Sequence, residues 1–276
     1  MNTEQDLVKV TQDYYDSSDA DAFYYHIWGG EDIHVGIYQS EEESIFAASQ
    51  RTVQKMLSML PSLDEDSKIL DLGAGYGGAA RYLALEKGCR VWCYNLSEKE
   101  NERNAEKNHQ LGLDKRIEVH QGNFENINFD EATFDVIWSE DALLHSNRKE
   151  KVFEEGWRVL KPGGDFIFTD PMQSDDCPDG VLQPILDRIH LEELGSVKRY
   201  CEIAQKVGFQ EAEVVEMPDQ LVNHYRRVLE EIDRNDDKIS GNVSEAYIEK
   251  MKKGLQHWIS GGQKGYLNWG ILHFRK

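Results

Sequence analysis

The stretch Asp71-Leu72-Gly73-Ala74-Gly75-Tyr76-Gly77-Gly78 decides the fold of this chain. It follows the apolar run Lys68-Ile69-Leu70 and precedes a helix-forming stretch over residues 79–85. Glycines at such a point let a strand turn sharply into a helix, and they let a ligand approach the backbone without meeting a Cβ atom. Dinucleotide-binding enzymes use a similar turn, so the glycines alone do not identify the ligand.

The acid in front of the first glycine is more distinctive than the glycines. The carboxylate of Asp71 could receive the ammonium group of a ligand, either directly or through water. The turn also lacks the late glycine and the basic residues of a phosphate loop. Both features favour S-adenosylmethionine, whose methionine part carries an ammonium group, over a pyrophosphate.

Four further segments follow the turn in a regular order. Residues 88–95 predict a second strand, after which Ser97 is placed to cap a helix. Residues 116–124 and 134–139 predict a third and a fourth strand, and residues 159–170 a turn and a fifth. In order and spacing, residues 65–217 resemble the class I S-adenosylmethionine-dependent methyltransferases.

This resemblance implies S-adenosylmethionine as the cofactor and assigns its site residue by residue. The residues expected to bind the cofactor are Asp71, Gly73, Gly75, Asn95, Leu96, Asn123, Phe124 and His34. The chain departs from the family at the ends of the second and third strands, where acids are usual and Asn95 and Asn123 stand here. An asparagine oxygen can still accept from a ribose hydroxyl or from the adenine amino group.

Composition restricts the partners of the chain. Its 276 residues carry 51 acids against 31 lysines and arginines, a formal charge of −20, so nucleic acid is an unsuitable substrate. The four cysteines have no metal-ligand spacing and suggest a reducing compartment. No apolar run has spanning length and the first residues are polar and acidic, so we expect no membrane contact and a cytoplasmic protein.

The order of elements predicts an α/β fold with one doubly wound, mostly parallel, seven-stranded sheet of the Rossmann-like kind. We expect an N-terminal flap and helix over residues 1–60 and a methyltransferase domain over 61–276. Residues 197–207 predict a helix and 209–217 the sixth strand. Residues 218–262 predict a lid of two helices, broken near Asp236-Asp237 and Ser240-Gly241, before a last strand over 265–274.

The N-terminal segment is unusually aromatic. Seven of the chain's 28 aromatic residues lie between Tyr14 and Tyr38, interleaved with glycines. Aromatic faces stabilise sulfonium and substituted ammonium groups, so the segment could close over a pocket. It could also simply fasten the N-terminus to the sheet, and the two roles are compatible.

Residues 23–38, Phe-Tyr-Tyr-His-Ile-Trp-Gly-Gly-Glu-Asp-Ile-His-Val-Gly-Ile-Tyr, are similar to the N-terminal segment of methyltransferases that act on glycine derivatives, phosphobases and tocopherols. Nearly from end to end, the chain resembles the betaine-forming sarcosine/dimethylglycine N-methyltransferases. Phosphoethanolamine methyltransferases share Asp141-Ala142-Leu143-Leu144-His145, and in them a tyrosine and this histidine lock the site. They carry a tyrosine directly after the fifth strand, where this chain has Pro171-Met172, which favours a smaller zwitterionic amine.

The resemblance also implies roles for individual residues. Tyr15 (or Tyr14) and His145 would form the lock, with Asp141 beside them. His145 could take the ammonium proton or only hold the flap closed. The residues expected to contact the substrate are Trp28, Tyr24, Arg188 and Met172. A substrate carboxylate needs a guanidinium, for which Arg188 is the first candidate and Arg226 the second.

Three classes of function agree with these observations. The first is N-methylation of sarcosine and dimethylglycine toward glycine betaine. The second is methylation of another small acceptor, such as phosphoethanolamine or a carbon or oxygen centre on a lipid or natural product. The third is S-adenosylmethionine binding without transfer. The sequence leaves open the number of successive methylations and the oligomeric state.

Overall fold

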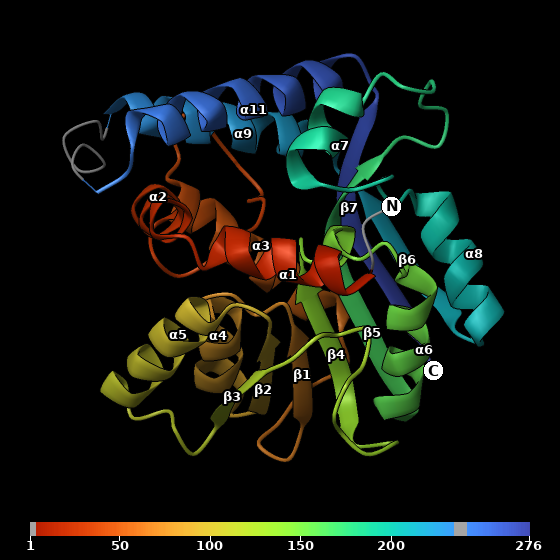
Figure 1. Cartoon of the computed structure of the whole chain (residues 1–276). Coiled ribbons are helices and arrows are strands. Elements are labelled where there is room, and N and C mark those ends of the chain that lie inside the picture. The colour runs from red at the N-terminus through yellow and green to blue at the C-terminus, as the bar shows by residue number, and fades with distance from the viewer. Residues whose placement is uncertain (1–3, 235–241) are drawn as a thin grey trace.

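The computed structural model describes residues 4–234 and 242–276 of the chain and contains one seven-stranded sheet (Figure 1). The strand order is β3-β2-β1-β4-β5-β7-β6. Strands β1 to β5 run parallel to one another, whereas β7 runs antiparallel to both β5 and β6. The strands are β1 Lys68–Leu72, β2 Arg90–Asn95, β3 Ile117–Gln121, β4 Phe134–Glu140, β5 Leu160–Gln173, β6 Gln210–Glu216 and β7 Leu267–Arg275. The predicted mostly parallel α/β sheet is confirmed.

Helices cover both faces of the sheet. Helices α3 and α4 pack on one face through side chains such as Met56 and Leu83, and α6 and α8 pack on the other through Phe153 and Tyr200. The helices that flank the sheet are α3 Ile45–Met59, α4 Gly78–Lys87, α5 Glu98–Gln110, α6 Lys149–Val159 and α8 Val197–Val207. The helix predicted before the first strand is thus α3, and Ser44 caps it by accepting from the Ala47 N–H.

The aromatic N-terminal segment folds as two helices, α1 Glu4–Tyr15 and α2 Ser18–Trp28. Helix α2 ends at Gly29, which adopts the left-handed conformation (φ 93°). Side chains of α2, among them Phe23 and Ile27, pack against α9 Pro218–Arg234 and α11 Glu245–Gln263. The flap therefore packs against the lid, whereas α3 belongs to the sheet.

Helices α9 and α11 form the predicted lid and lie side by side at one end of the sheet (Figure 1). The break predicted near Asp236-Asp237 and Ser240-Gly241 lies outside the described residues. One helix of this region was not predicted: α7 Gln183–Ile189 follows β5 and contacts α11. Strand β5 also continues three residues beyond Asp170, because residues 171–173 pair with β7.

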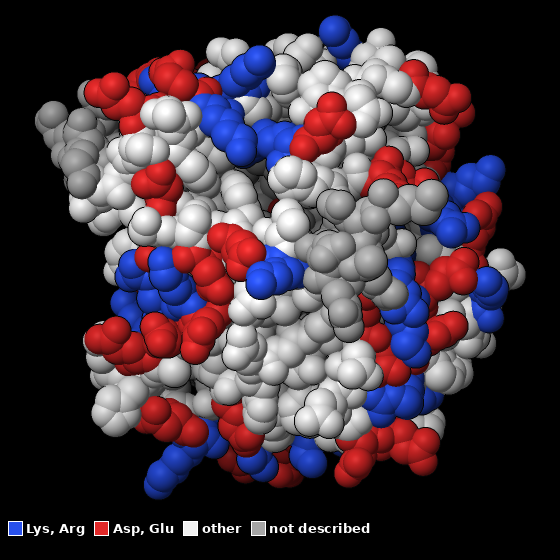
Figure 2. Space-filling view, viewed as in Figure 1, with Lys and Arg blue, Asp and Glu red and all other residues white. Residues whose placement is uncertain are grey.

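Lysines, arginines and acids alternate over the face shown in Figure 2, without a continuous basic patch on that face. All four cysteines are free thiols, and Cys89 and Cys93 are buried. Within residues 4–234 and 242–276, no cluster of three or more His, Cys, Asp or Glu could hold a metal ion. In the same residues, no helix combines the length and the apolar character needed to cross a membrane.

Candidate active site

A first cavity lies where the parallel strands β1 to β4 end. Its lining comes from the loops that follow these strands and from α1, which covers it. The predicted cofactor residues that line it are Gly73, Gly75, Asn95, Leu96, Asn123 and Phe124. Helix α1 contributes Val8, Thr11, Gln12 and Tyr15. Ligands of open α/β sheets bind at this edge, so the position fits a nucleoside cofactor.

Gly73 is required by the shape of this cavity. Its φ is +75°, in the left-handed region, and its N–H donates to the Tyr94 carbonyl at 2.8 Å. A Cβ atom built on Gly73 would lie 2.3 Å from the Ala142 Cβ. The turn after β1 therefore touches the loop after β4, and only glycine allows this approach.

A buried acid, Glu100, lies beside the amide of Asn95. The Asn95 Nδ2 donates to the Glu100 Oε2 at 2.9 Å, and Glu100 lines the cavity. Glu100 is held at the start of α5, where its N–H donates to the Ser97 hydroxyl at 3.2 Å. Burial raises the pKa of Glu100 to about 7. An acid thus lines the cavity beside Asn95, at the end of the second strand, and our sequence analysis did not identify it.

Asp71 does not line this cavity. The Asp71 side chain is buried. Burial is the main reason that the pKa of Asp71 lies well above the usual range, and the negative charges of Glu140 and Asp32 raise it further. The acid that reaches the cavity from β4 is Glu140, another residue that the sequence analysis missed. Asp71 is adjacent in the sheet to Trp138, two residues before Glu140 on β4, so both acids belong to the same region.

His34 lines a second cavity and not the first, contrary to its assignment to the cofactor. Its Nε2 lies 3.4 Å from the Glu140 Oε1 and 3.6 Å from the Asp32 Oδ1. Burial opposes a charge on His34, but the Glu140 and Asp32 carboxylates outweigh it and raise its pKa to about 10. An imidazolium at this position offsets the negative charge between the two cavities.

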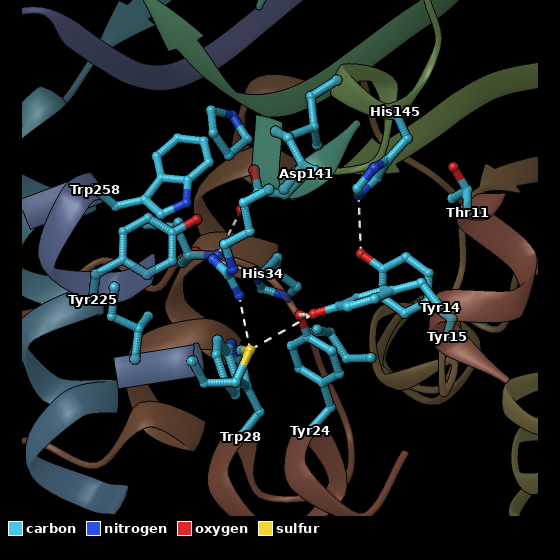
Figure 3. A pocket seen from close by; sticks show the side chains of 18 of the residues that line it. Thr11, Tyr14, Tyr15, Tyr24, Trp28, His34, Asp141, His145, Tyr225 and Trp258 are labelled. Carbon is cyan, nitrogen blue, oxygen red and sulfur yellow. Dashed lines mark hydrogen bonds between the residues drawn. The ribbon is translucent and has the colours of Figure 1, made fainter. Parts of the chain in front are cut away.

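The second cavity adjoins the first and is mostly aromatic (Figure 3). Its walls come from α1 and α2, from the loop after β4, and from the helices α7, α9 and α11. The predicted site residues that line it are Tyr15, Tyr24, Trp28, Asp141, His145 and Arg188, and the lid adds Tyr225 and Trp258. Figure 3 shows the flap side chains Tyr14, Tyr15, Tyr24 and Trp28 and the lid side chains Tyr225 and Trp258 around one space. Residues from distant parts of the chain thus surround one cavity.

Tyr15, Asp141 and His145 line both cavities and so stand at their junction. The Tyr15 hydroxyl lies 2.9 Å from the His145 Nε2, whereas Tyr14 pairs with the Tyr24 hydroxyl at 3.0 Å. Of the two tyrosines that the sequence left open, Tyr15 is therefore the partner of His145. Burial lowers the pKa of His145 to about 4, so the ring is neutral near pH 7.

Asp141 is fixed by unusual backbone geometry. Its φ is +51°, which is uncommon for a residue other than glycine. Its Oδ2 accepts from the Val35 N–H at 2.6 Å, and its Oδ1 accepts from the Trp269 Nε1–H at 2.8 Å. These bonds hold the carboxylate at the junction, where a positive charge on either ligand would be stabilised.

Arg188 differs from the other arginine candidate in having no acid beside it. Its guanidinium donates to the Met251 Sδ at 2.8 Å, and no described carboxylate lies within 4.0 Å of it. Arg226, in contrast, lines a separate surface hollow and pairs with Glu41 at 3.6 Å. The structure therefore keeps Arg188, and not Arg226, as a candidate for a substrate carboxylate.

Met172 does not reach the cavity to which the sequence assigned it. Its side chain is fully buried in the core cluster that contains Phe168 and Tyr200. The preceding residue, Pro171, lines the second cavity instead. The alternation of side chains along β5 explains this, because neighbouring residues of a strand face opposite sides of the sheet.

Residues 70–168 match the model of a methyltransferase domain family. The sarcosine/dimethylglycine N-methyltransferase of Halorhodospira halochloris is 53% identical over 269 residues, which cover 98% of this chain and 96% of that protein. The enzyme of the same name from Aphanothece halophytica is 51% identical over 270 residues, 98% of either chain. The crystal structure of a proposed sarcosine dimethylglycine methyltransferase from Galdieria sulphuraria superposes with a TM-score of 0.88 at 44% identity, covering 94% of this chain and 98% of that one. The chain belongs to the family of sarcosine/dimethylglycine N-methyltransferases.

Proposed function

We propose that the chain transfers the methyl group of S-adenosylmethionine to the nitrogen of sarcosine and dimethylglycine, toward glycine betaine. The nitrogen lone pair attacks the methyl carbon as the carbon–sulfur bond breaks, and S-adenosylhomocysteine leaves. The acceptor must therefore lose its ammonium proton before transfer. Such a reaction gains mainly from alignment in a dry site, without a covalent enzyme intermediate.

The observation that carries this proposal is that one cavity combines aromatic walls with the guanidinium of Arg188, which has no described carboxylate within 4.0 Å. Arg188 suits a carboxylate, and a chain with 51 acids that leaves this half-buried cation without an acidic partner among the described residues favours an anionic ligand. Tyr24 and Trp28 line the same cavity and offer faces to a methylated nitrogen. A small amino acid with a methylated nitrogen satisfies both requirements.

The cofactor residues fit S-adenosylmethionine in the first cavity. Glu100 and Asn95 offer acceptors to the ribose hydroxyls, and Asn123 offers one to the adenine amino group. When bound, the cofactor supplies the electrophilic methyl group. The carboxylate of Asp141, at the junction, favours the positive charge of the sulfonium and of the acceptor.

The Tyr15–His145 pair positions a hydroxyl at the junction of the two cavities. The Tyr15 hydroxyl lies 2.9 Å from the His145 Nε2, and burial lowers the pKa of His145 to about 4, so the imidazole is too weak a base to keep the ammonium proton. The pair therefore orients the Tyr15 hydroxyl beside the acceptor nitrogen, and the proton leaves to solvent before the site closes. The same hydrogen bond joins α1 to the loop after β4 and so also holds the flap over the site.

The test is methyl transfer from isotopically labelled S-adenosylmethionine to dimethylglycine, sarcosine, glycine, phosphoethanolamine and a phenol. We expect dimethylglycine or sarcosine to be the best acceptor, then glycine, then phosphoethanolamine. Glycine offers no methyl groups to the aromatic walls, and a phosphate needs more positive charge than one guanidinium supplies. Turnover of phosphoethanolamine without turnover of dimethylglycine would establish the alternative function.

A further inference from the structure

His224 is a buried side chain of the second cavity to which neither the sequence nor the family comparison gives a role. It lies on the lid helix α9, is 1% exposed, and lines the cavity together with Arg188. The lid is built of charged and apolar residues on an amphipathic helix, so a buried histidine there requires its own explanation.

The hydrogen bonds of His224 fix its tautomer. The Gly36 backbone N–H, which can only donate, points to the His224 Nδ1 at 3.1 Å, and the Tyr38 hydroxyl lies 3.0 Å from the same atom. Nδ1 is therefore an acceptor without a proton. A neutral imidazole carries its proton on the other nitrogen, so His224 is the Nε2–H tautomer.

The Nε2–H of His224 has no partner among the described residues. The same holds for the Nε1–H of Trp28, whose ring centroid lies 5.7 Å from that of His224. Buried donors are normally satisfied, and leaving one unpaired costs free energy. The guanidinium of Arg188 donates to a sulfur and has no oxygen acceptor among the described residues. The Nε2 of His34, in the same cavity, also makes no hydrogen bond, but the Glu140 carboxylate lies 3.4 Å from it.

Among the described residues, no acceptor reaches the Nε2–H of His224 or the Nε1–H of Trp28. Asp141, the carboxylate that lines this cavity, accepts instead from the Val35 N–H and the Trp269 Nε1–H. A carboxylate has about four lone-pair sites on two oxygens and can accept from a guanidinium and from further N–H groups at once. A ligand carboxylate therefore matches the unpaired donors better than a hydroxyl or an amine does.

We propose that the Nε2–H of His224 binds the carboxylate of the methyl acceptor alongside Arg188, and that His224 thereby helps the enzyme select amino acids. This inference rests on the proposed function. The lid then contributes directly to substrate recognition, because α9 brings His224 to the carboxylate while α1 and α2 surround the nitrogen.

The test compares two substitutions of His224 that differ in the donor they retain. In His224→Asn the side chain can still accept from the Gly36 N–H but is too short to replace Nε2–H. In His224→Gln the longer amide can place an N–H near the position of Nε2. We expect His224→Asn to raise the KM for dimethylglycine at least about tenfold with a smaller change in kcat, and His224→Gln to recover most of that loss. His257→Asn, on the lid but outside the lining of the second cavity, should leave both constants within about twofold of the unsubstituted enzyme.

Proton–nitrogen NMR of the unsubstituted enzyme with 15N-labelled histidine provides a measurement that does not depend on a variant's folding. The His224 signals, identified by their loss in His224→Gln, should report the Nε2–H tautomer. Dimethylglycine added to the S-adenosylhomocysteine complex should move the Nε2–H proton downfield. An unchanged KM for dimethylglycine in His224→Asn would overturn the role of His224, and so would an Nε2–H chemical shift that does not change when dimethylglycine is added. If the unsubstituted enzyme neither binds nor methylates dimethylglycine, the proposed function itself fails.

Discussion

Charge balance at single residues explains how an acidic protein can bind an anionic substrate. Around the cofactor cavity the acids are buried and close together, and Asp32 and Glu140 flank the cationic His34. In the neighbouring cavity Arg188 has no such partner. A carboxylate would therefore find its counter-charge in one cavity and repulsion in the other, which orients the substrate.

Arg188 is the residue on which substrate affinity should depend most. Arg188→Gln removes the charge and the guanidinium fork, so the KM for dimethylglycine should rise about 30- to 100-fold, equivalent to roughly 2–3 kcal/mol. Steady-state kinetics with S-adenosylmethionine at saturation measure this effect. Arg226→Gln is the matched control and should leave KM nearly unchanged, because Arg226 pairs with Glu41 in a separate hollow. Equal effects of the two substitutions would remove Arg188 from the site.

The turn after β1 provides a second test at this scale. Gly73→Ala would place a Cβ 2.3 Å from that of Ala142 and push apart the two loops that line the cofactor cavity. We expect at least a tenfold loss of S-adenosylmethionine affinity in calorimetry. Gly163→Ala is the control, since Gly163 also has a positive φ, +80°, but no neighbour within 4 Å of the added atom. It should lose about 1–2 kcal/mol of stability through backbone strain and no cofactor affinity. Unchanged affinity in Gly73→Ala would contradict the assigned cofactor position.

The flap helices α1 and α2 form hydrogen bonds with α5 and with the residues just before it, next to the cofactor cavity. At the end of α1 the Asp16 Oδ1 accepts from the Ser97 hydroxyl at 2.7 Å and from the Lys99 N–H at 3.3 Å, beside the start of α5. On α2, Asp21 accepts two hydrogen bonds from Arg103, at 2.7 and 2.6 Å. Cofactor binding should therefore stabilise α1 and α2 together with the start of α5, which follows Asn95.

Hydrogen exchange tests this coupling between the flap and the cofactor. S-adenosylhomocysteine should slow exchange in α1 much more than in α6, which does not line either cavity. Asp16→Asn should weaken this protection and the cofactor affinity several-fold, because an amide accepts less strongly than a carboxylate. Asp13→Asn, on the exposed side of the same helix, should change neither. Equal protection of α1 and α6 would show that the flap does not close on the cofactor.

Some elements and site residues could be predicted from the sequence, and others could not. The glycine turn and strands β1 to β5 could be predicted because each is encoded by neighbouring residues, and the family resemblance assigned Tyr15, Asp141 and His145 to the site. Glu100 was missed because its role follows from a side-chain contact with Asn95 within the fold. His224 was missed because its tautomer, and so its unpaired Nε2–H, is fixed by a hydrogen bond from Gly36, which lies 188 residues away in the sequence. Met172 was misplaced because β5 continues past its expected end, and the strand turns its side chain into the core.

The charge of the whole molecule should make its stability depend on salt. With 51 acids against 31 lysines and arginines, self-repulsion opposes folding, and salt screens this repulsion. The surface ion pairs that salt would weaken contribute only about 0–1 kcal/mol each. We expect Tm to rise by several degrees between about 0.01 and 0.5 M sodium chloride in calorimetry at pH 7. A fall in Tm over this range would show that the ion pairs outweigh the net repulsion.

The central claim is that the enzyme recognises its methyl acceptor as an amino acid. It is tested most directly by comparing kcat/KM for dimethylglycine and for N,N-dimethylethanolamine, which carries the same tertiary amine with a hydroxymethyl group in place of the carboxylate. A site built to bind a carboxylate leaves its donors unpaired with this analogue, so we expect a preference for dimethylglycine of at least about 100-fold. Equal kcat/KM values, or a preference for N,N-dimethylethanolamine, would contradict the account.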